Sequence, residues 1–185
     1  PQQSMTITPT QYSEFPALAW TGSEWGVVWK ESTAGADADE IFLMRISADG
    51  SRVESDVQVT TGAVLFNGGP RISWSGSAFG AAWSDSRSGD TVVYFGMISS
   101  TGALLAESPL STPGSGPLVS YFGPDIAWSG SEFAVTWPYE LSGTDTDPLV
   151  SFTRISADGT PGPEVPVVMN GGSYTVMDDL FAEWT

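Results

Sequence analysis

Cysteine and histidine are both absent from the 185-residue sequence. Their absence excludes disulfides, metal sites built from Cys or His, and the Ser-His and Cys-His pairs of nucleophilic hydrolases. Long apolar runs are also missing, because no segment approaches the ~20 residues that a membrane-spanning helix needs. The chemistry open to this sequence therefore comes mainly from carboxylates, hydroxyls, amides and aromatic rings.

Basic residues are scarce. The 6 Lys and Arg stand against 22 Asp and Glu, which gives a net charge of −16 and a pI near 4.1. Such a surface repels phosphate backbones and anionic lipid headgroups, so we expect neither a nucleic-acid partner nor a membrane partner. Acidic β-repeats rich in Gly, Ser, Thr, Pro and Trp are typical of exported proteins, and we expect a secreted or cell-surface location.

The sequence does contain a threefold repeat. The motif Pro-x-[IL]-[AS]-Trp-[ST]-Gly-Ser-x-[FW]-x-[VA]-x-Trp occurs at residues 16–29, 70–83 and 124–137. Its proline, glycine and two tryptophans recur at constant spacing. A period near 50 residues is typical of an array of identical supersecondary units.

Each copy of the motif predicts two short strands joined by a tight hairpin turn. In the first copy, Leu18 and Trp20 alternate with smaller residues before the turn, and Trp25, Val27 and Trp29 alternate after it. The glycine between the two strands supplies the positive φ that a hairpin needs. We interpret the tryptophans as core packing residues rather than as a binding surface.

Two further strands are predicted after each motif. The third strands are expected at 41–47, 92–99 and 149–156, each ending in a Ser-Ala-Asp-Gly or Ser-Ser-Thr-Gly turn. The fourth strands are expected at 57–60, 109–112 and 165–168. Prolines at 109 and 166 mark the fourth strands as edge strands, where a missing backbone N–H costs least.

Four antiparallel strands per ~50 residues, with landmark aromatics and repeated hairpin turns, are typical of β-propeller blades. The unit resembles a blade repeat common in secreted bacterial proteins. The resemblance lies in the tryptophan motif followed by Arg-Ile-Ser-Ala-Asp-Gly, complete at 16–50 and 124–159, with Met97-Ile-Ser-Ser-Thr-Gly as the weaker middle version. It implies an all-β, propeller-type repeat of four-stranded antiparallel blades. It does not imply a reaction, because propellers serve as lectins, hydrolases and scaffolds alike.

We expect residues 1–185 to form a single repeat domain. Three complete blades are predicted at about 12–60, 64–112 and 118–168, with stray strands at 5–8 and 176–185 that belong to partial blades. Closed propellers need at least about four blades. We therefore expect the chain to be part of a larger propeller, either by continuation in a longer chain or as a homo-oligomer.

The loops between second and third strands carry a candidate metal site. Asp37 and Asp39 in one loop, and Asp145 and Asp147 in another, could offer oxygen ligands to Ca²⁺, which takes several carboxylate and carbonyl oxygens. Neither loop has the glycine and terminal glutamate of an EF-hand, and a solvated acidic loop is the alternative interpretation. We expect no other cofactor.

Aromatic residues in the connections that precede the motifs, on the same face, form a candidate ligand-binding set. They are Tyr12, Phe66, Tyr121, Phe122 and Tyr174. Rings at a blade mouth, beside Asp and Asn, can stack on sugars. The alternative interpretation is that these rings cover the ends of the tryptophan core, since aromatics are chiefly packing residues.

An enzymatic site is the rival hypothesis. Propeller glycosidases place two or three carboxylates at the channel mouth, roughly 5 to 9.5 Å apart, and Asp125, Asp178 and Asp179 are the carboxylates expected nearest such a mouth. Arg71 occupies the position of Asp125 one blade earlier, which predicts an ion pair between blades instead. Arg45, Arg71 and Arg154 fall on different strands of different blades, so they do not predict a three-arginine sialidase site.

No catalytic residues are therefore predicted. The sequence favours an extracellular binding or scaffold module whose ligand is a carbohydrate or a protein. A fragment of a propeller glycoside hydrolase and a purely structural surface or filament repeat protein are the alternatives.

Overall fold

The computed structural model describes residues 12–32, 39–62, 69–111, 123–139 and 149–168. These residues form twelve β-strands and no helix. None of the described segments is therefore a helix long and apolar enough to cross a lipid bilayer. The predicted stray strands at 5–8 and 176–185 lie outside the described residues.

The strands form three separate four-stranded sheets, each antiparallel and each following the chain order. The first sheet contains β1 (Tyr12–Trp20), β2 (Glu24–Ser32), β3 (Asp39–Ser47) and β4 (Val57–Gln58). The second contains β5 (Arg71–Trp74), β6 (Ala78–Asp85), β7 (Val92–Ser99) and β8 (Leu104–Pro109). The third contains β9 (Asp125–Trp128), β10 (Glu132–Tyr139), β11 (Leu149–Ser156) and β12 (Val165–Val168).

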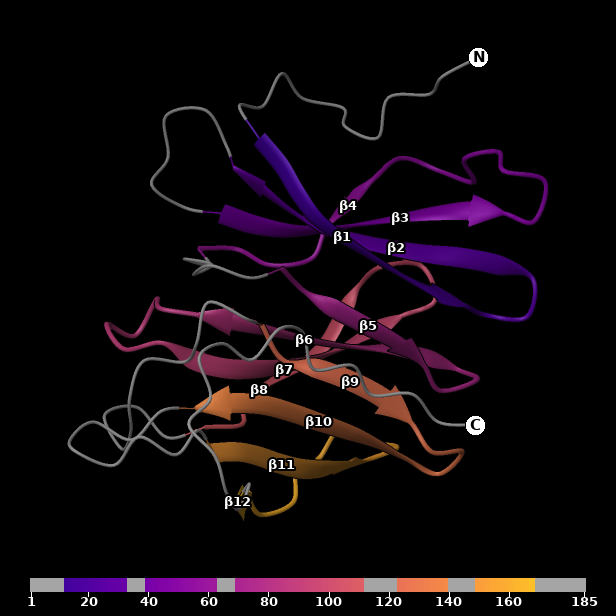
Figure 1. The fold of residues 1–185 in the computed structure, drawn as a ribbon. Helices are drawn as coiled ribbons and strands as arrows, with labels where there is room; N and C mark the ends of the chain where they lie inside the picture. Colours follow the sequence, from indigo (N-terminus) through magenta and orange to yellow (C-terminus); the bar gives the residue numbers. More distant parts are fainter. Residues whose placement is uncertain (1–11, 33–38, 63–68, 112–122, 140–148, 169–185) are drawn as a thin grey trace.

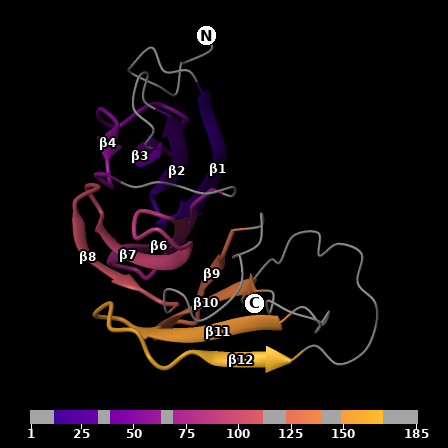
Figure 2. The same cartoon turned by 90° about the vertical axis from the view of Figure 1, so that its left-hand side faces the viewer.

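The three sheets are consecutive blades. They follow one another in chain order from the top to the bottom of Figure 1. The first strands are neighbours, because β5 contacts both β1 and β9. In Figure 2, β1 and β9 lie on the inner side of the arc and β4 and β8 on its outer side. This is the arrangement that the repeat predicts, with first strands inside and fourth strands at the outer edge.

The hairpin turns of the motif are confirmed. Trp20 pairs with Trp25, and the equivalent pairs are Trp74 with Phe79 and Trp128 with Phe133. The turn glycines Gly22, Gly76 and Gly130 have φ values of 100°, 95° and 97°. Since L-residues rarely adopt this region, glycine is required at these three positions.

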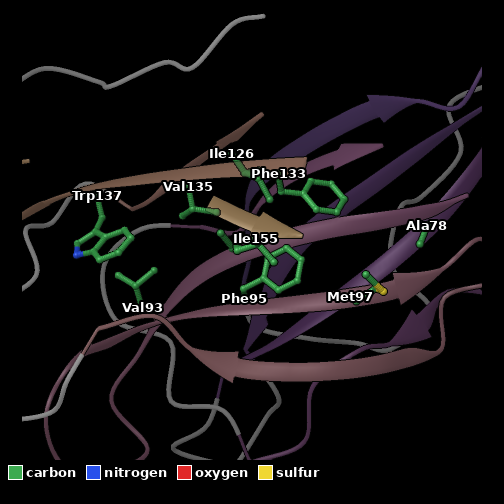
Figure 3. Close-up of a cluster of buried hydrophobic side chains, with 10 residues drawn as sticks. Ala78, Val93, Phe95, Met97, Ile126, Phe133, Val135, Trp137 and Ile155 are labelled. Atoms are coloured by element: carbon green, nitrogen blue, oxygen red, sulfur yellow. The ribbon is translucent and has the colours of Figure 1, made fainter. Parts of the chain in front are cut away.

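The predicted core role holds for the second tryptophan of each motif, and Trp74 and Trp128, the first tryptophans of the later motifs, also pack against the core. Trp29, Trp83 and Trp137 are fully buried. Figure 3 shows Trp137, Val135 and Phe133 of the third blade packed against Val93 and Phe95 of the second. In the first blade, however, Trp20 and Trp25 are exposed, so for these two the prediction of core packing is wrong.

β3 begins at Asp39 rather than 41 and β4 ends at Gln58 rather than 60, and two other strands differ more from their predicted bounds. The fourth strand of the second blade is Leu104–Pro109 rather than 109–112, because pairing with β7 begins directly after the turn at Gly102. β1 begins at Tyr12, well before the motif's proline, and contains a bulge between Glu14 and Ala17. The fourth strands β4, β8 and β12 are edge strands, as predicted.

The turns between third and fourth strands are held by a carboxylate where the sequence provides one. The Ser47 hydroxyl donates to Asp49 Oδ1 at 2.5 Å, and the Ser51 N–H donates to the same oxygen at 3.0 Å. The hydrogen bond from Ser47 is the main reason that the pKa of Asp49 lies below its usual value. Asp158 has the same arrangement with Ser156 and Thr160.

Candidate functional site

A group of aromatic and charged side chains lies where the loop between β2 and β3 leaves the first blade. We call it the mouth cluster, and its members are Tyr12, Glu14, Phe15, Lys30 and Asp39. Register explains why they meet, because Tyr12 pairs with Ser32, Glu14 with Lys30, and Asp39 with Ser32. Paired residues point to the same face of a sheet. Three strands therefore bring these side chains to one place.

The ammonium group of Lys30 is the centre of the mouth cluster. Its Nζ lies 3.4 Å from Glu14 Oε2 and 3.0 Å from Asp39 Oδ2. The same atom lies 5.6 Å from the centre of the Phe15 ring, within the range of a cation–π contact. The Ser32 hydroxyl donates to Asp39 Oδ1 at 2.5 Å. These contacts hold the polar side chains of the mouth cluster in place before any ligand arrives.

Two aromatic rings of the mouth cluster face solvent. Tyr12 is 64% exposed and Phe15 is 44% exposed. Exposed rings next to ordered charges are unusual for residues whose role is packing, because aromatic side chains contribute to stability mainly through the area that they bury.

Phe15 has a strained backbone. Its φ is 54°, and it is the only described non-glycine residue with a positive φ. An L-residue in this region costs of order 1–3 kcal/mol and persists only where its surroundings impose it. Gly69 helps to impose it, since a Cβ at Gly69 would lie 2.0 Å from the Cβ of Phe15. The backbone of the connection into the second blade thus packs directly on Phe15.

Sequence reasoning missed Phe15. The repeat nevertheless contains a signal, because the residue immediately before the motif's proline is Gly69 in the second copy and Gly123 in the third. A bulky aromatic at a position where the other two copies have glycine marks a departure from the repeat. This substitution of phenylalanine for glycine adds an exposed ring to the mouth cluster.

The predicted site residues fall into two groups. Tyr12 belongs to the mouth cluster, although it lies in β1 rather than in a connection before the strand. Asp39 also belongs to it, and is engaged by Lys30 and Ser32. The others lie outside the described residues: Asp37, Phe66, Tyr121, Phe122, Asp145, Asp147 and Tyr174. Among the residues that are described, no group of three or more acidic side chains is placed to hold a metal ion.

The corresponding end of the second blade carries a closed ion-pair network. Arg87 Nε donates to Asp85 Oδ2 at 2.6 Å, and its two terminal nitrogens each lie 3.1 Å from a Glu107 oxygen. The guanidinium also stacks over the Tyr94 ring at 4.8 Å. Each of these charged groups has partners within its own blade, which indicates a structural role.

Arg71 and Asp125 lie on the neighbouring inner strands β5 and β9. Burial raises the pKa of Asp125, while the N–H of Ile126 and the charge of Arg71 act in the opposite direction. The ion pair between Arg71 and Asp125 stays a prediction. Asp178 and Asp179 lie outside the described residues.

Arg45 and Arg154, the two other arginines considered for a sialidase-like site, do not lie near Asp125. Arg45 contacts Glu24 at 3.2 Å and Glu54 at 2.9 Å. Arg154 lies 3.4 Å from Glu132. Each is thus paired within its own blade, as expected for residues that do not share a ligand.

No protein-family model matches the sequence, and a search of curated proteins gives no match. Solved structures do match. The subtype N10 neuraminidase-like protein of A/little yellow-shouldered bat/Guatemala/060/2010 is 14% identical with a TM-score of 0.52, covering 86% of this chain and 44% of that one. The chain is a partial β-propeller. It spans less than half the length of that neuraminidase-like protein.

Two further structures match the partial propeller less well. The exo-1,5-α-L-arabinanase from a bovine ruminal metagenomic library is 14% identical with a TM-score of 0.44, covering 84% of this chain and 59% of that one. The acylaminoacyl peptidase of Pyrococcus horikoshii is 15% identical with a TM-score of 0.44, covering 89% of this chain and 26% of that one. The assignment of the fold depends on the first match and on the sheet topology.

Proposed function

We propose that this partial propeller is an extracellular binding module that recognises carbohydrate through the mouth cluster. The observation that carries the proposal is Phe15, an exposed aromatic residue held in a strained backbone conformation three residues after Tyr12 in β1. Strained residues cluster at ligand sites because the surrounding structure maintains them for a purpose other than stability. The secreted or cell-surface location remains an expectation from composition.

The chemistry of the mouth cluster suits a sugar. The apolar C–H faces of a pyranose stack on aromatic rings, and its hydroxyls bond to carboxylates and ammonium groups. Tyr12 and Phe15 supply the rings, and Glu14 supplies a carboxylate whose side chain is 45% exposed. A few fixed polar groups around an apolar contact surface are the usual composition of a small-ligand site.

A glycoside hydrolase fragment is the second candidate, and Asp125 is the observation that favours it. A general acid needs a pKa raised above the ordinary carboxyl value, and burial raises the pKa of Asp125. Hydrolysis needs a second carboxylate at a defined separation. Asp178 and Asp179 are the proposed partners on sequence grounds alone.

The test is a glycan array with the intact chain and three variants. Phe15→Gly restores the residue of the other repeats and relieves the backbone strain, so we expect binding to fall at least tenfold while the melting temperature holds or rises. Tyr12→Ala should also weaken binding. Leu105→Ala is the control, because Leu105 is equally exposed but lies on β8 at the outer edge.

The same array separates the alternatives. Loss of signal in EDTA would support the proposed Ca²⁺ site near Asp37, Asp39, Asp145 and Asp147. Turnover of any glycan that Asp125→Asn abolishes would favour the hydrolase instead. Unchanged binding in both Phe15→Gly and Tyr12→Ala would rule out the mouth cluster, and absence of any glycan signal would leave protein binding or a structural role.

A further inference from the structure

The hairpin end of the first blade exposes an apolar surface that the other two blades bury. We call it the front patch, and its members are Leu18, Trp20 and Trp25. Leu18 is 61% exposed, whereas the residues at the same position in the later blades, Ile72 and Ile126, are 8% and 5% exposed. In the later blades this surface packs on the preceding blade. Among the described blades, none packs on the front patch as the preceding blade packs on its counterparts.

The front patch is already arranged as it would be inside a blade junction. Its two rings, Trp20 and Trp25, lie 4.8 Å apart at an angle of 49°. The corresponding pairs in the later blades have separations of 4.6 Å and angles of 57° and 60°: Trp74 with Phe79, and Trp128 with Phe133. No reorganisation of these rings is needed before a partner docks, which lowers the entropic cost of association.

At both internal junctions, the phenylalanine ring of this pair packs on a glycine of the preceding blade; we call each such glycine contact a socket. A Cβ at Gly26 would lie 2.5 Å from the Phe79 ring, and a Cβ at Gly80 would lie 2.7 Å from the Phe133 ring. The phenylalanine of each later blade thus sits directly on the backbone of the blade before it. The third blade has Ala134 at the position of Gly26 and Gly80.

The third blade exposes the complementary surface at the other end of the array. We call it the back patch, and it comprises Ala134, Phe152, Arg154, Val165 and Val167. Val167 is 43% exposed, whereas Val59 at the same position in the first blade is 6% exposed within the core. A hollow of about 330 Å³ opens here, lined in part by Phe152, Arg154 and Val165.

The hollow corresponds to the place where a neighbouring blade inserts a turn. At the two internal junctions, a Cβ at the turn glycine Gly102 would lie 3.0 Å from Val57, and one at Gly159 would lie 3.2 Å from Met97. In the third blade, register places Val165 and Arg154 at the positions of Val57 and Met97. The equivalent turn glycine of the first blade, Gly50, has nothing within 4 Å. Within the described part of the chain, the turn at Gly50 and the hollow of the third blade therefore have no blade packed against them.

We propose that the front patch of one copy of this chain docks on the back patch of a second copy, head to tail. The occupant is a second copy because each patch is the counterpart of a surface that the chain already buries against itself. The Arg154 side chain, 66% exposed and 3.4 Å from Glu132, lines the hollow, and Asp49 in the turn of the incoming copy would share this guanidinium with Glu132. The patches lie on the first and third blades, at opposite ends of the array in Figure 1, so one chain does not join them by itself. The contact is heterologous and propagates into rings or filaments.

Ala134 limits the strength of this contact. Its Cβ stands where the two internal junctions have none, so the incoming Trp25 ring must shift to avoid it. Overpacking of this kind weakens an interface. Ala134→Gly should therefore tighten association on the order of tenfold.

The test is sedimentation velocity across a wide range of protein concentration. We expect the unmodified chain to associate with concentration, and Leu18→Asp and Ala134→Arg each to be monomeric, because one removes the front patch and the other the back patch. In an equimolar mixture, the intact front patch of Ala134→Arg can dock on the intact back patch of Leu18→Asp. The mixture should therefore form a dimer and nothing larger. Leu105→Asp, at the outer edge of the second blade, is the matched control and should associate like the unmodified chain.

Three outcomes would overturn the proposal. The first is an unmodified chain and an Ala134→Gly variant that both stay monomeric at every concentration. The second is a mixture of the two blocked variants that fails to dimerise although both melt like the unmodified chain. The third is self-association of Ala134→Arg equal to that of the unmodified chain, which would indicate a front-to-front contact.

Discussion

Three tryptophans at equivalent positions are buried to the same degree but differ in the partner of the indole N–H. Trp29 Nε1 donates to Glu31 Oε2 at 2.8 Å, and both side chains are buried. No described residue accepts a hydrogen bond from Trp83 Nε1. The second tryptophan of the motif is therefore a packing residue in both blades, and in the first blade its indole N–H also donates a hydrogen bond to a buried carboxylate.

Replacing these two tryptophans by phenylalanine isolates that difference. Both changes remove similar volume, so the cavity costs are comparable. Trp29→Phe also takes a donor away from the buried Glu31, which should destabilise the fold by about 1–3 kcal/mol more than Trp83→Phe. Urea unfolding of both variants measures the difference. Equal losses would show that the Trp29 hydrogen bond contributes no net stability.

Asp125 gives the fold a defined pH dependence. Burial raises its folded-state pKa, so the folded chain holds this proton more tightly than the unfolded chain, whose carboxyl titrates near 3.9. As pH rises from below about 3.9 through the raised folded-state pKa, the unfolded chain loses the proton first and the free energy of unfolding falls. Asp125→Asn cannot ionise and should avoid that loss.

We therefore expect Asp125→Asn to be more stable than the unmodified chain at neutral pH, with the gap closing in acid. Arg71→Met should widen the gap, because it removes a charge that opposes the raised pKa. Urea unfolding between about pH 3 and pH 7 measures both. A gap that does not change with pH would show that Asp125 titrates alike in the folded and unfolded chain.

Residue types in the sequence predicted part of the candidate site. The repeat predicts that Arg71 and Asp125 occupy the same position on neighbouring first strands, and they do begin β5 and β9; the ion pair between them stays a prediction. Tyr12 was identified as a candidate ligand residue, but its place in β1 was not, because the bulge after Glu14 hides the period-two pattern of that strand. Phe15 was missed because an unusual φ is a property of the backbone and not of residue type.

At the scale of the strands, the blade junctions depend on the absence of two Cβ atoms. Phe133 of β10 fills the space above Gly80 of β6, and Phe79 does the same above Gly26. Neither glycine has a positive φ. These glycines are therefore required by the close approach of a ring rather than by backbone conformation.

Gly80→Ala should destabilise the chain by about 1–3 kcal/mol, because the added methyl group meets the Phe133 ring at 2.7 Å. The cost should shrink in a Phe133→Leu background, where the ring is gone. Ala134→Gly, at the same position of the third blade, is the control and should cost only the backbone entropy of about 0.5–1 kcal/mol. A double-mutant cycle by urea unfolding measures the coupling between the changes at Gly80 and Phe133. Additive losses would contradict the close contact between the two positions.

The sequence predicted the strands well where turn chemistry and side-chain alternation coincide. β6, β7, β10 and β11 follow directly from paired aromatics and Gly turns. β8 was misplaced because Leu104 and Leu105 do not alternate with polar residues, and because pairing starts immediately after Gly102 through a bulge at Met97 and Ile98. The exposure of Trp20 and Trp25 could not be predicted either, since burial depends on which blade precedes them.

At the scale of the whole molecule, the three described blades follow one another in an array, and among them only the middle blade packs against another on both faces. One core cluster joins the first blade to the second, through Val28, Leu43, Phe79 and Trp83. Another joins the second to the third, through Phe95, Phe133 and Trp137. In such arrays stability is approximately a sum of unit and nearest-neighbour terms, so the ends open at lower free energy than the middle.

Hydrogen exchange should resolve this gradient in a dilute, monomeric sample. We expect the amides of β6 and β7 to exchange slowest, those of β2, β3, β10 and β11 faster, and the edge strands β4 and β12 fastest among the described strands. Gly80→Ala weakens only the second junction, so it should speed exchange in β10 and β11 while leaving β2 and β3 unchanged. Equal exchange rates in all three blades, or equal acceleration at both ends by Gly80→Ala, would show that the array unfolds as one cooperative unit, in which the loss of one junction is shared by every blade.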